Sequence, residues 1–518
     1  MFASLFWGFL LRLGQGAVEA SLTLVVGVVV AGVLRRMVGP AGTRRLFGSG
    51  AKGLFRGWLA GMLLPVCALG VIPVAREMRR AGVPGGTVLA FVLAAPLLNP
   101  LSFLYGLTLA EPVVILTFAG LSLVVATCAG FLWDRVFGRG ASVTEAEELA
   151  RTADAEPLPA AGLRRVAAVA VTAAKELAGR DLVFYAVGLL ASALLSAAIP
   201  FGSLQHTMHH TDKSSPLLMT ALAVPLYSSP LPGMMKIGLM FEHGNSIGAA
   251  FVLFTLGIGT SAGTVTWLLT DFGGRRVLPW LGAYLAVVLA VAYATEPVLY
   301  DTRKEEADHT HAFDDYSAPF PSGSGGPAEA GAKLAEKFGP MEQPAVYGFV
   351  ALLAAGVVLR RADRAGALER WLTAPPPSRA RTRWDANVPG SVLGAVSLLG
   401  LVAFSVVGAY LYYPDREQCF EEMKAVHADA VVAARTGKRD EAIRQLERWD
   451  LLTRKLQVGV YIRTLRLSDE QARSADDLRE RLEEVRDALL ANDATVAESA
   501  LPALERAYRT CRTAFAPN

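Results

Sequence analysis

The sequence has little charge and little cysteine for its length. Of its 518 residues, 19% are Asp, Glu, Lys or Arg and 53% are hydrophobic, whereas an ordinary soluble chain has about 25% charged residues. The four cysteines are scattered, which excludes a disulfide scaffold and a zinc site built from Cys-x-x-Cys pairs. The net charge is only +3 and the basic residues form short clusters between apolar runs. This pattern predicts membrane-topology signals and argues against nucleic acid as a partner.

Motifs that would indicate catalysis are also missing. The sequence contains no HExxH zinc motif and no P-loop, and no paired catalytic residues are evident. We therefore expect a chain that is not an enzyme and that holds no cofactor. Without a P-loop, any ATP-driven step would need a separate subunit.

The apolar residues are gathered into runs that are long enough to cross a bilayer, which takes about 20 residues. The uncharged runs are 86–110, 112–133, 182–202, 214–235, 244–270, 277–295 and 388–414, with a shorter one at 344–359. Two further runs, 17–34 and 54–75, contain Glu19 and Arg56. The sequence therefore predicts an all-α polytopic membrane protein.

Basic residues in short loops indicate how these runs are oriented, because Lys and Arg favour the cytoplasmic side. If every run crossed fully, the basic cluster at 76–80 and the linker 135–180 would both lie outside. Both lie inside if 54–80 enters from the cytoplasm and returns, and if 214–243 does the same from the outside. Pro and Gly interrupt both segments midway. Two re-entrant hairpins are the prediction, and two kinked spanning helices are the alternative.

An internal repeat favours the hairpins. The sequence Ala-Phe-Val-Leu at 90–93 recurs at 250–253, and the same shift along the chain aligns Pro65 with Pro225 without a gap. The order helix, broken hairpin, helix, helix occurs twice, and the two leading helices run in opposite directions. These features predict two inverted-topology repeats, which in secondary transporters hold the substrate at mid-membrane between them.

The chain divides into six segments on these patterns. They are permease repeat 1 (1–133), a cytoplasmic linker (134–180), permease repeat 2 (181–295), an exoplasmic loop (296–343), two additional transmembrane helices (344–414) and an exoplasmic helical bundle (415–518).

The last segment differs from the rest in being rich in charge of both signs. Its apolar spacing predicts four amphipathic helices that end near Gly437, Ser468 and Asn492 and pack as a soluble bundle. An up-down-up-down bundle places Cys419 beside Cys511. We expect a disulfide there if the compartment is oxidising, and two free buried thiols are the alternative.

Histidines fall on the outer side of this topology, and four residues of the outer loop carry imidazole and carboxylate groups suited to Zn, Cu or Ni. The candidate ligands are Asp308, His309, His311 and Asp314. The alternative is that His and Asp are simply common in exposed loops.

Polar and helix-breaking residues at membrane depth form the candidate substrate pathway. They are Cys67, Pro96, Asn99, Ser228, Ser229, Thr260 and Ser261. Helix ends and free carbonyl groups at such breaks can hold a solute without charged side chains. Each small residue, taken singly, is also explained by close helix packing. Glu19 lies within an apolar run and is the candidate proton-coupling group, with an interfacial salt bridge as the alternative.

The segment LPVCALGVIPVA at 64–75, followed by RRAGVP at 79–84 and LAFVLAAPLLN at 89–99, resembles the bacterial predicted-permease family that includes organoarsenical efflux permeases and proposed copper/zinc efflux permeases. The resemblance covers residues 1–295. The family usually shows Cys-Ser-Cys where this sequence has Cys67-Ala68-Leu69. Only Cys67 carries over, and it cannot form a three-thiolate arsenic site with the distant Cys128.

The resemblance and the topology together imply a secondary permease of the bacterial inner membrane. They imply an efflux system that moves a small solute of the metal or metalloid class by alternating access. Its partners would be membrane lipid and the solute or metal ion, and a homo-oligomer is left open. The alternative is a non-transporting membrane sensor or assembly factor whose C-terminal bundle binds a periplasmic partner.

Overall fold

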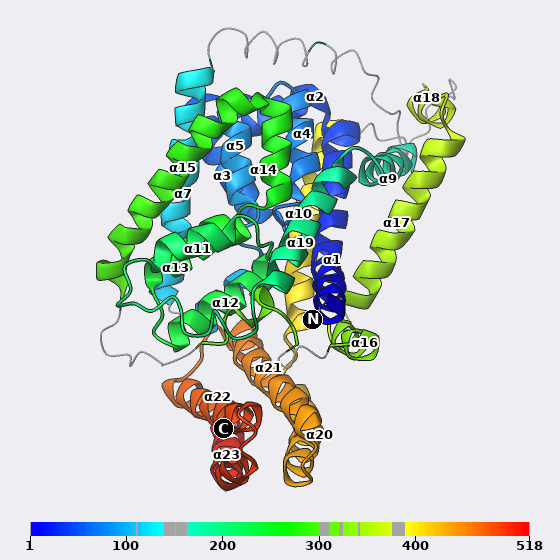
Figure 1. Cartoon of the computed structure of the whole chain (residues 1–518). Helices are drawn as coiled ribbons and strands as arrows, with labels where there is room; N and C mark the ends of the chain where they lie inside the picture. Colours follow the sequence, from blue (N-terminus) through cyan, green and yellow to red (C-terminus); the bar gives the residue numbers. More distant parts are fainter. Residues whose placement is uncertain are drawn as a thin grey trace. The chain divides into compact units, whose positions relative to one another are not determined.

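The structure, a computed structural model, describes residues 2–109, 112–138, 151, 163–300, 310–320, 325–339, 342–374 and 389–516 (Figure 1). The described residues form helices and no strand. Among these described residues, six helices are long and apolar enough to cross a membrane, which confirms the prediction of an all-helical polytopic protein. The chain divides into two compact units, a body (1–103 and 113–405) and a tail unit (104–112 and 406–518).

Within residues 2–109 and 112–138, the structure describes seven helices and one π-helical turn at Leu34–Val38. The helices are α1 (Phe2–Val33), α2 (Gly39–Phe47), α3 (Gly50–Leu63), α4 (Val71–Arg80), α5 (Gly85–Ala94), α6 (Pro100–Leu109) and α7 (Pro112–Phe137). Two apolar runs that could have formed continuous helices are interrupted where Pro occurs. One break lies at 64–70 and the other at 95–99, because Pro cannot donate the backbone hydrogen bond that a continuous helix needs.

The second half follows the linker helix α9 (Leu163–Leu177). It consists of α10 (Asp181–Ala198), α11 (Ser215–Ala223), α12 (Pro230–Glu242), α13 (Ile247–Val252) with a π-helical extension at Leu253–Ile258, α14 (Ala262–Leu268) with a π-helical extension at Leu269–Gly273, and α15 (Gly274–Leu299). Its helices are interrupted at 224–229 and at 259–261.

The segment from α3 to α5 enters and leaves the body at the same end. Arg44 of α2 donates a hydrogen bond to the carbonyl of Ala81, directly after α4 (2.8 Å). The amide of Gly86, at the start of α5, donates to the carboxylate of Asp134 near the end of α7 (2.8 Å). We call this the α2 end. At about 1.5 Å per residue, α3 and α4 are each shorter than a bilayer core.

The segment from α11 to α13 has its open side at the other end. Ser215, at the start of α11, donates to the carbonyl of His209 (2.8 Å). The amide of Gly248, at the start of α13, donates to Glu296 near the end of α15 (2.5 Å). Helix α15 has 26 residues and spans about 39 Å, so this end lies far from the α2 end. We call it the α16 end after α16 (Pro327–Ala335); Figure 1 shows α2 and α4 at the top of the body and α12 and α16 at the bottom.

Three further helices are described between residues 342 and 412. They are α17 (Glu342–Ala362), α18 (Ala367–Thr373) and α19 (Gly390–Tyr412). Helix α17 crosses α9 closely at Gly356, where a side chain would overlap the carbonyl of Ala174. Large apolar side chains on α17 and α19 are mostly exposed, including Val358 and Leu399. Such surfaces are expected of helices that face lipid.

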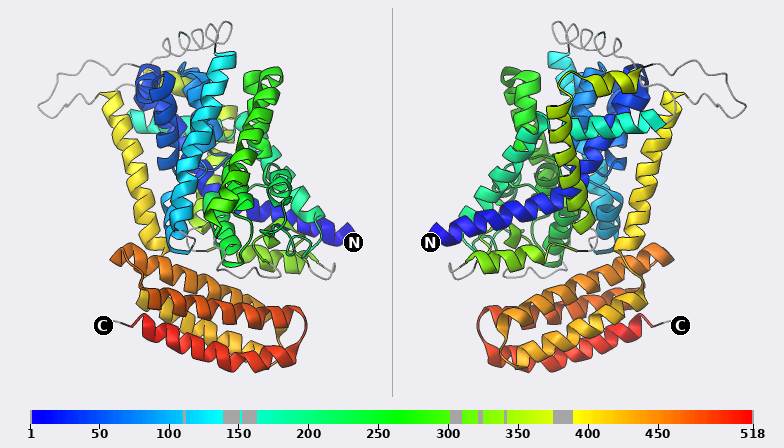
Figure 2. Two further views of the ribbon diagram at one scale, coloured as in Figure 1. Left: turned by 90° about the vertical axis from the view of Figure 1, so that its left-hand side faces the viewer. Right: turned by 90° about the vertical axis from the view of Figure 1, so that its right-hand side faces the viewer.

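The tail unit contains the four predicted helices, which lie side by side in Figure 2. They are α20 (Arg416–Arg435), α21 (Arg439–Thr464), α22 (Asp469–Leu490) and α23 (Ala494–Ala514). Gly437 takes a positive φ of 71° at the first turn, and Ser468 forms a capping box with Gln471 at the start of α22. Described residues 416–514 of the tail unit thus form four helices, and the turns between them lie near Gly437, Ser468 and Asn492.

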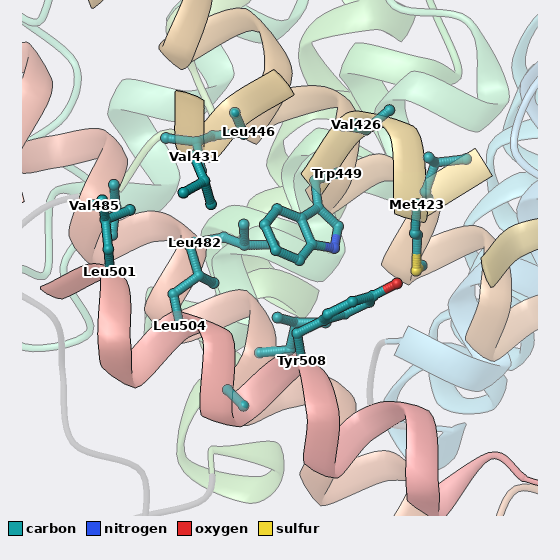
Figure 3. Packing of buried hydrophobic residues seen from close by; sticks show 14 of the residues in the cluster. Met423, Val426, Val431, Leu446, Trp449, Leu482, Val485, Leu501, Leu504 and Tyr508 are labelled. Atoms are coloured by element: carbon teal, nitrogen blue, oxygen red, sulfur yellow. The ribbon is translucent and has the colours of Figure 1, made fainter. Parts of the chain in front are cut away.

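The tail core is apolar and is centred on two aromatic rings, Trp449 and Tyr508, whose centroids lie 5.1 Å apart (Figure 3). Leu482 and Leu504 pack beside them in the same buried cluster. The tail unit also includes the second half of α6. The Tyr105 hydroxyl there accepts a hydrogen bond from the buried Arg454 guanidinium (3.1 Å).

Candidate transport site

The break between α3 and α4 meets α10 and the start of α14. The hydroxyl of Thr264, in the first turn of α14, donates to the carbonyl of Ala68 in the break between α3 and α4. Leu69 of the same break packs against Gly188 of α10 and Gly263 of α14, where a Cβ atom would lie 2.7 and 2.8 Å from it. The break of the first half is therefore held by elements of the second half.

Helix α1 crosses the same break at very short range. A Cβ atom at Gly27 would overlap the Gly70 carbonyl oxygen, and one at Gly70 would overlap the backbone of Thr23. Only glycine allows two backbones to approach this closely. The crossing fixes the position of Cys67, whose thiol accepts a hydrogen bond from the Gly70 amide (3.3 Å).

Cys67 is fully buried, and two aromatic hydroxyl groups lie near it. The phenol of Tyr227, in the break between α11 and α12, faces the Cys67 thiol and the Thr23 hydroxyl. Tyr185 of α10 lies close enough to Cys67 to interact with it electrostatically. Cys67, in the break between α3 and α4, and Tyr227, in the break between α11 and α12, thus lie close together.

Three phenol oxygens in this region are buried without a hydrogen bond of ordinary geometry to any described residue. They belong to Tyr185, Tyr227 and Tyr316, which are all at most 6% exposed. The Tyr316 phenol faces the hydroxyl of Ser228, which is itself buried in the second break. Buried polar atoms normally have a partner, and leaving one unpaired costs about 1–3 kcal/mol. These unpaired groups are available to bind a hydrogen-bonding solute.

Several predicted pathway residues lie at helix ends. Asn99 accepts a hydrogen bond from the Ser102 amide (2.8 Å) at the start of α6, and Ser261 accepts one from the Thr264 amide (3.1 Å) at the start of α14. Thr260 donates to the carbonyl of Leu256 (2.7 Å). Their side chains cap or continue helices on either side of the breaks.

Pro96 and Ser229 complete the predicted set. Pro96 lies in the break between α5 and α6, and Leu97 beside it approaches Gly259 of the other half, where a Cβ atom would lie 3.0 Å away. Ser229 is buried and precedes Pro230 at the start of α12, although its side chain does not cap that helix. Of the seven predicted residues, Cys67 and Ser228 lie beside the unpaired phenols.

A group of ion pairs closes the α2 end. Arg76 of α4 pairs with Asp181 at the start of α10, whose side chain is 0% exposed, and with Asp271 at 3.5 Å. Arg79 lies 3.9 Å from Asp271 and stacks over the Phe272 ring at 4.1 Å. These contacts join α4 of the first half to the second half of the body.

A second group lies at the α16 end, around Asp315 in the segment 310–320. Arg12 of α1 and Lys236 of α12 each lie 3.4 Å from its carboxylate, and Lys337 lies at 4.0 Å. Lys337 is the main cause of a pKa for Asp315 well below the usual range, and Lys236 and Arg12 act in the same direction against the effect of burial. Asp315 in turn raises the pKa of Lys337.

Glu19 belongs to this second group, 3.8 Å from Lys337. The structure therefore places the proposed proton-coupling residue in a salt bridge, which is the alternative that its sequence position left open. Two of the four predicted metal ligands also meet in this region, since His311 Nδ1 lies 2.8 Å from Asp314 and Gln205 contacts both. The other two, Asp308 and His309, lie outside the described residues.

Cys419 and Cys511 are free and buried, so the disulfide suggested by the bundle order is not formed in this structure. The Cys419 thiol lies toward the carbonyl of Pro414, and Cys511 lies beside Ser474. Burial raises the pKa of each thiol to about 12. The structure thus agrees with the alternative expectation, in which Cys419 and Cys511 are buried free thiols.

Comparison with known proteins adds the family. A family model described as "Predicted permease" matches residues 8–296, which is more than half of the chain. The chain belongs to this predicted permease family. A protein of Bacillus subtilis (strain 168), described as "UPF0718 protein YcgR", is 33% identical over 85 residues. That match covers 16% of this chain and 29% of the relative, so the chain spans less than a third of the relative's length. No solved structure matches.

The chain is a member of the predicted permease family, and the part of it that the structure describes has six apolar helices of membrane-spanning length, so it is a multi-pass membrane protein. The family points to a transporter and away from an enzyme. Residues 297–518, including the segment 310–320 and the tail, lie beyond the matched range. Sequence reasoning missed Tyr185 and Tyr316 at the site. One signal was available for the ion pairs, since the shift that aligns Pro65 with Pro225 also aligns Arg76 with Lys236.

Proposed function

We propose that this chain is a secondary permease of the bacterial inner membrane that exports a small solute by alternating access between two inverted-topology repeats. The open side of the first hairpin lies at the α2 end and that of the second at the α16 end. Each repeat also ends with a carboxylate, Asp134 or Glu296, that binds the first-turn amide of a preceding helix. Matching contacts at opposite ends support the inverted arrangement and re-entrant hairpins.

The observation that carries the proposal is the set of unpaired phenols around Cys67 and Ser228. Two of the three phenols, Tyr185 and Tyr227, belong to the second repeat, whereas Cys67 belongs to the first. A solute bound there would contact both repeats. In an alternating-access cycle the substrate must do so, because the movement of one repeat against the other exposes the site to each side in turn.

Metals and metalloids are the substrate class that this site suits best. Cys67 provides one soft sulfur atom and the phenols provide oxygen atoms, a mixed set that suits a borderline metal ion or a hydroxylated metalloid. A single thiol does not provide the three sulfur ligands of a thiolate cage. The family resemblance supports the same class and the direction of efflux.

The basic clusters support a cytoplasmic α2 end. Arg35, Arg44, Arg79 and Arg80 all lie near it, and the linker 134–180 begins there. Lys and Arg in such short connections favour the cytoplasm. The α16 end and the tail are then exoplasmic, and the exposed apolar faces of α7, α17 and α19 contact lipid.

Flux measurements test this function. Inverted membrane vesicles that contain the full chain would be supplied with Cu⁺, Zn²⁺, arsenite or antimonite, and uptake would be compared with empty vesicles. We expect Cys67→Ser to lose most of the flux. Tyr227→Phe removes one hydrogen bond, worth about 0.5–1.5 kcal/mol, and should weaken apparent affinity about two- to tenfold.

Cys128→Ser is the matched control, because Cys128 is an exposed thiol on α7 and its replacement should leave the flux unchanged. Wild-type flux in both Cys67→Ser and Tyr227→Phe would show that the site lies elsewhere. Absence of flux for every solute, with the protein folded in the membrane, would favour the sensor or assembly factor instead.

A further inference from the structure

The two ends of the body carry equivalent cations. Arg76 of α4 and Lys236 of α12 occupy matching positions, because the shift that aligns the two hairpin breaks also aligns these two residues. Each cation belongs to the second helix of its hairpin and points to a carboxylate outside that hairpin. Arg76 pairs with Asp181, and Lys236 pairs with Asp315 at 3.4 Å. The ion pair of one end therefore has a counterpart at the other.

A phenol accompanies each pair on the side of the central site. Tyr185 follows Asp181 by one helical turn and interacts electrostatically with Arg76 and Cys67. Tyr316 follows Asp315 directly in the sequence. The centroid of its ring lies 5.0 Å from the Lys236 ammonium, and its phenol faces Ser228. At each end, the ion pair therefore lies outermost, the phenol lies next to it, and the hairpin break follows toward the central site.

The two closures differ in where their carboxylate comes from. Asp181 is part of the second repeat, whereas Asp315 comes from 310–320, beyond the range that matches the permease family. This segment is folded into the body. Its Tyr316 and Phe313 are at most 2% exposed, and the amide of Ala318 donates to the carbonyl of Ile199 (2.8 Å).

Helix α1 holds the segment from the other side. Arg12 donates to the backbone carbonyls of Asp314 and Ser317, both at 2.6 Å. Pro319 also packs against Gly8, where a Cβ atom would lie 3.2 Å away. The segment consequently bridges α1 of the first repeat and α12 of the second, the two elements that must separate if the α16 end opens.

We propose that residues 310–320 form the closing element of the α16 end, anchored by Lys236 and Arg12 through Asp315, and that it opens when the Arg76–Asp181 closure of the α2 end is formed. The proposal rests on the transport pathway proposed above. It adds a part that the matched permease domain does not contain. Loosening one closure should shift the population toward the state that is open at that end.

Thiol labelling of Cys67 from each side tests this directly. The full chain would be prepared in right-side-out spheroplasts and in inverted vesicles, and treated with a membrane-impermeant sulfonated methanethiosulfonate. The fraction modified at Cys67 would be read by peptide mass spectrometry. Asp315→Asn and Lys236→Gln should each raise the labelling rate from the α16 side about five- to tenfold and lower it from the α2 side. Arg76→Gln should do the reverse.

Asp212→Asn is the control, because it removes one carboxylate from an exposed turn at the α16 end. That carboxylate accepts hydrogen bonds from the amide and the hydroxyl of Ser214. It should change neither rate. Unchanged labelling in both Asp315→Asn and Lys236→Gln, or an equal rise from both sides that reflects general loosening, would overturn the closure. The assay needs no transported solute, so its failure leaves the flux result of the central site standing, and the reverse also holds.

Discussion

Single residues in the body keep unusual states that the fold alone does not require. Tyr185, Tyr227 and Tyr316 bury hydroxyl groups without a hydrogen bond of ordinary geometry to any described residue, and Phe would fill nearly the same volume without that penalty. Residues that break a local rule are concentrated at functional sites. These three phenols therefore indicate the candidate transport site more specifically than the helix breaks do.

In the tail, His427 is a partly buried titratable residue. The centroid of its ring lies 4.9 Å from the ring centroids of both Trp449 and Tyr508. Burial lowers the pKa of His427 below 6.5, opposed by Glu505. The unfolded tail then binds more protons than the folded tail between the two pKa values. Stability from this group is fully present above about pH 6.5 and falls as the pH decreases through that window.

We therefore expect α20 and α23 to exchange amide hydrogens faster at pH 5.5 than at pH 7.5, after correction for intrinsic rates. Hydrogen exchange with mass spectrometry on the full chain in detergent measures this locally. His427→Gln removes the titrating group, and most of the pH dependence should disappear. A variant as pH-sensitive as the wild type in these two helices would contradict the assignment.

Elements of the body are positioned by glycine at their crossings. Gly27→Ala places a methyl group on the Gly70 carbonyl oxygen, and neither backbone can move without displacing Cys67. Overpacking of this kind costs about 1–3 kcal/mol. Thermal unfolding in detergent should show a clearly lower midpoint for Gly27→Ala, together with reduced flux.

The matched change is Gly120→Ala on α7, where nothing lies within 4 Å of the new methyl group. Alanine is the better helix former by roughly 0.5–1 kcal/mol, so the midpoint should stay or rise. Equal loss of stability in both variants would mean that the α1 crossing is not the constraint.

The positions of most helix breaks could be predicted from the sequence. Pro65, Pro96 and Pro225 locate three of the four breaks, because the missing amide hydrogen of Pro acts locally. The partners across the breaks were not predictable in the same way. That Thr264 would bond to Ala68, or that Tyr316 would face Ser228, depends on distant segments meeting in space. Glu19 likewise looked like an isolated buried acid until Lys337 was placed beside it.

In the whole molecule, a relation between the two halves was predicted from the sequence, whereas the position of the segment 310–320 was not. The internal repeat predicted two related halves, and the contacts of Asp134 and Glu296 recur at opposite ends. The segment 310–320 could not be predicted as part of the site, since its polar residues read as an outer loop with candidate metal ligands. Its buried Phe313 and Tyr316 become meaningful only when α1 and α12 are placed on either side of it.

Inverted topology makes a prediction about the entire chain that labelling can decide. Lys52, at the start of α3, and Asp212, before α11, are both exposed and occupy corresponding positions before the two hairpins. In a Cys128→Ser background, Lys52→Cys should react with an impermeant maleimide only from the cytoplasmic side, and Asp212→Cys only from the outside. Parallel repeats would place both thiols on one side. Labelling of both from the same side would therefore exclude the inverted arrangement, because residues exposed at opposite ends of a membrane body cannot share a compartment.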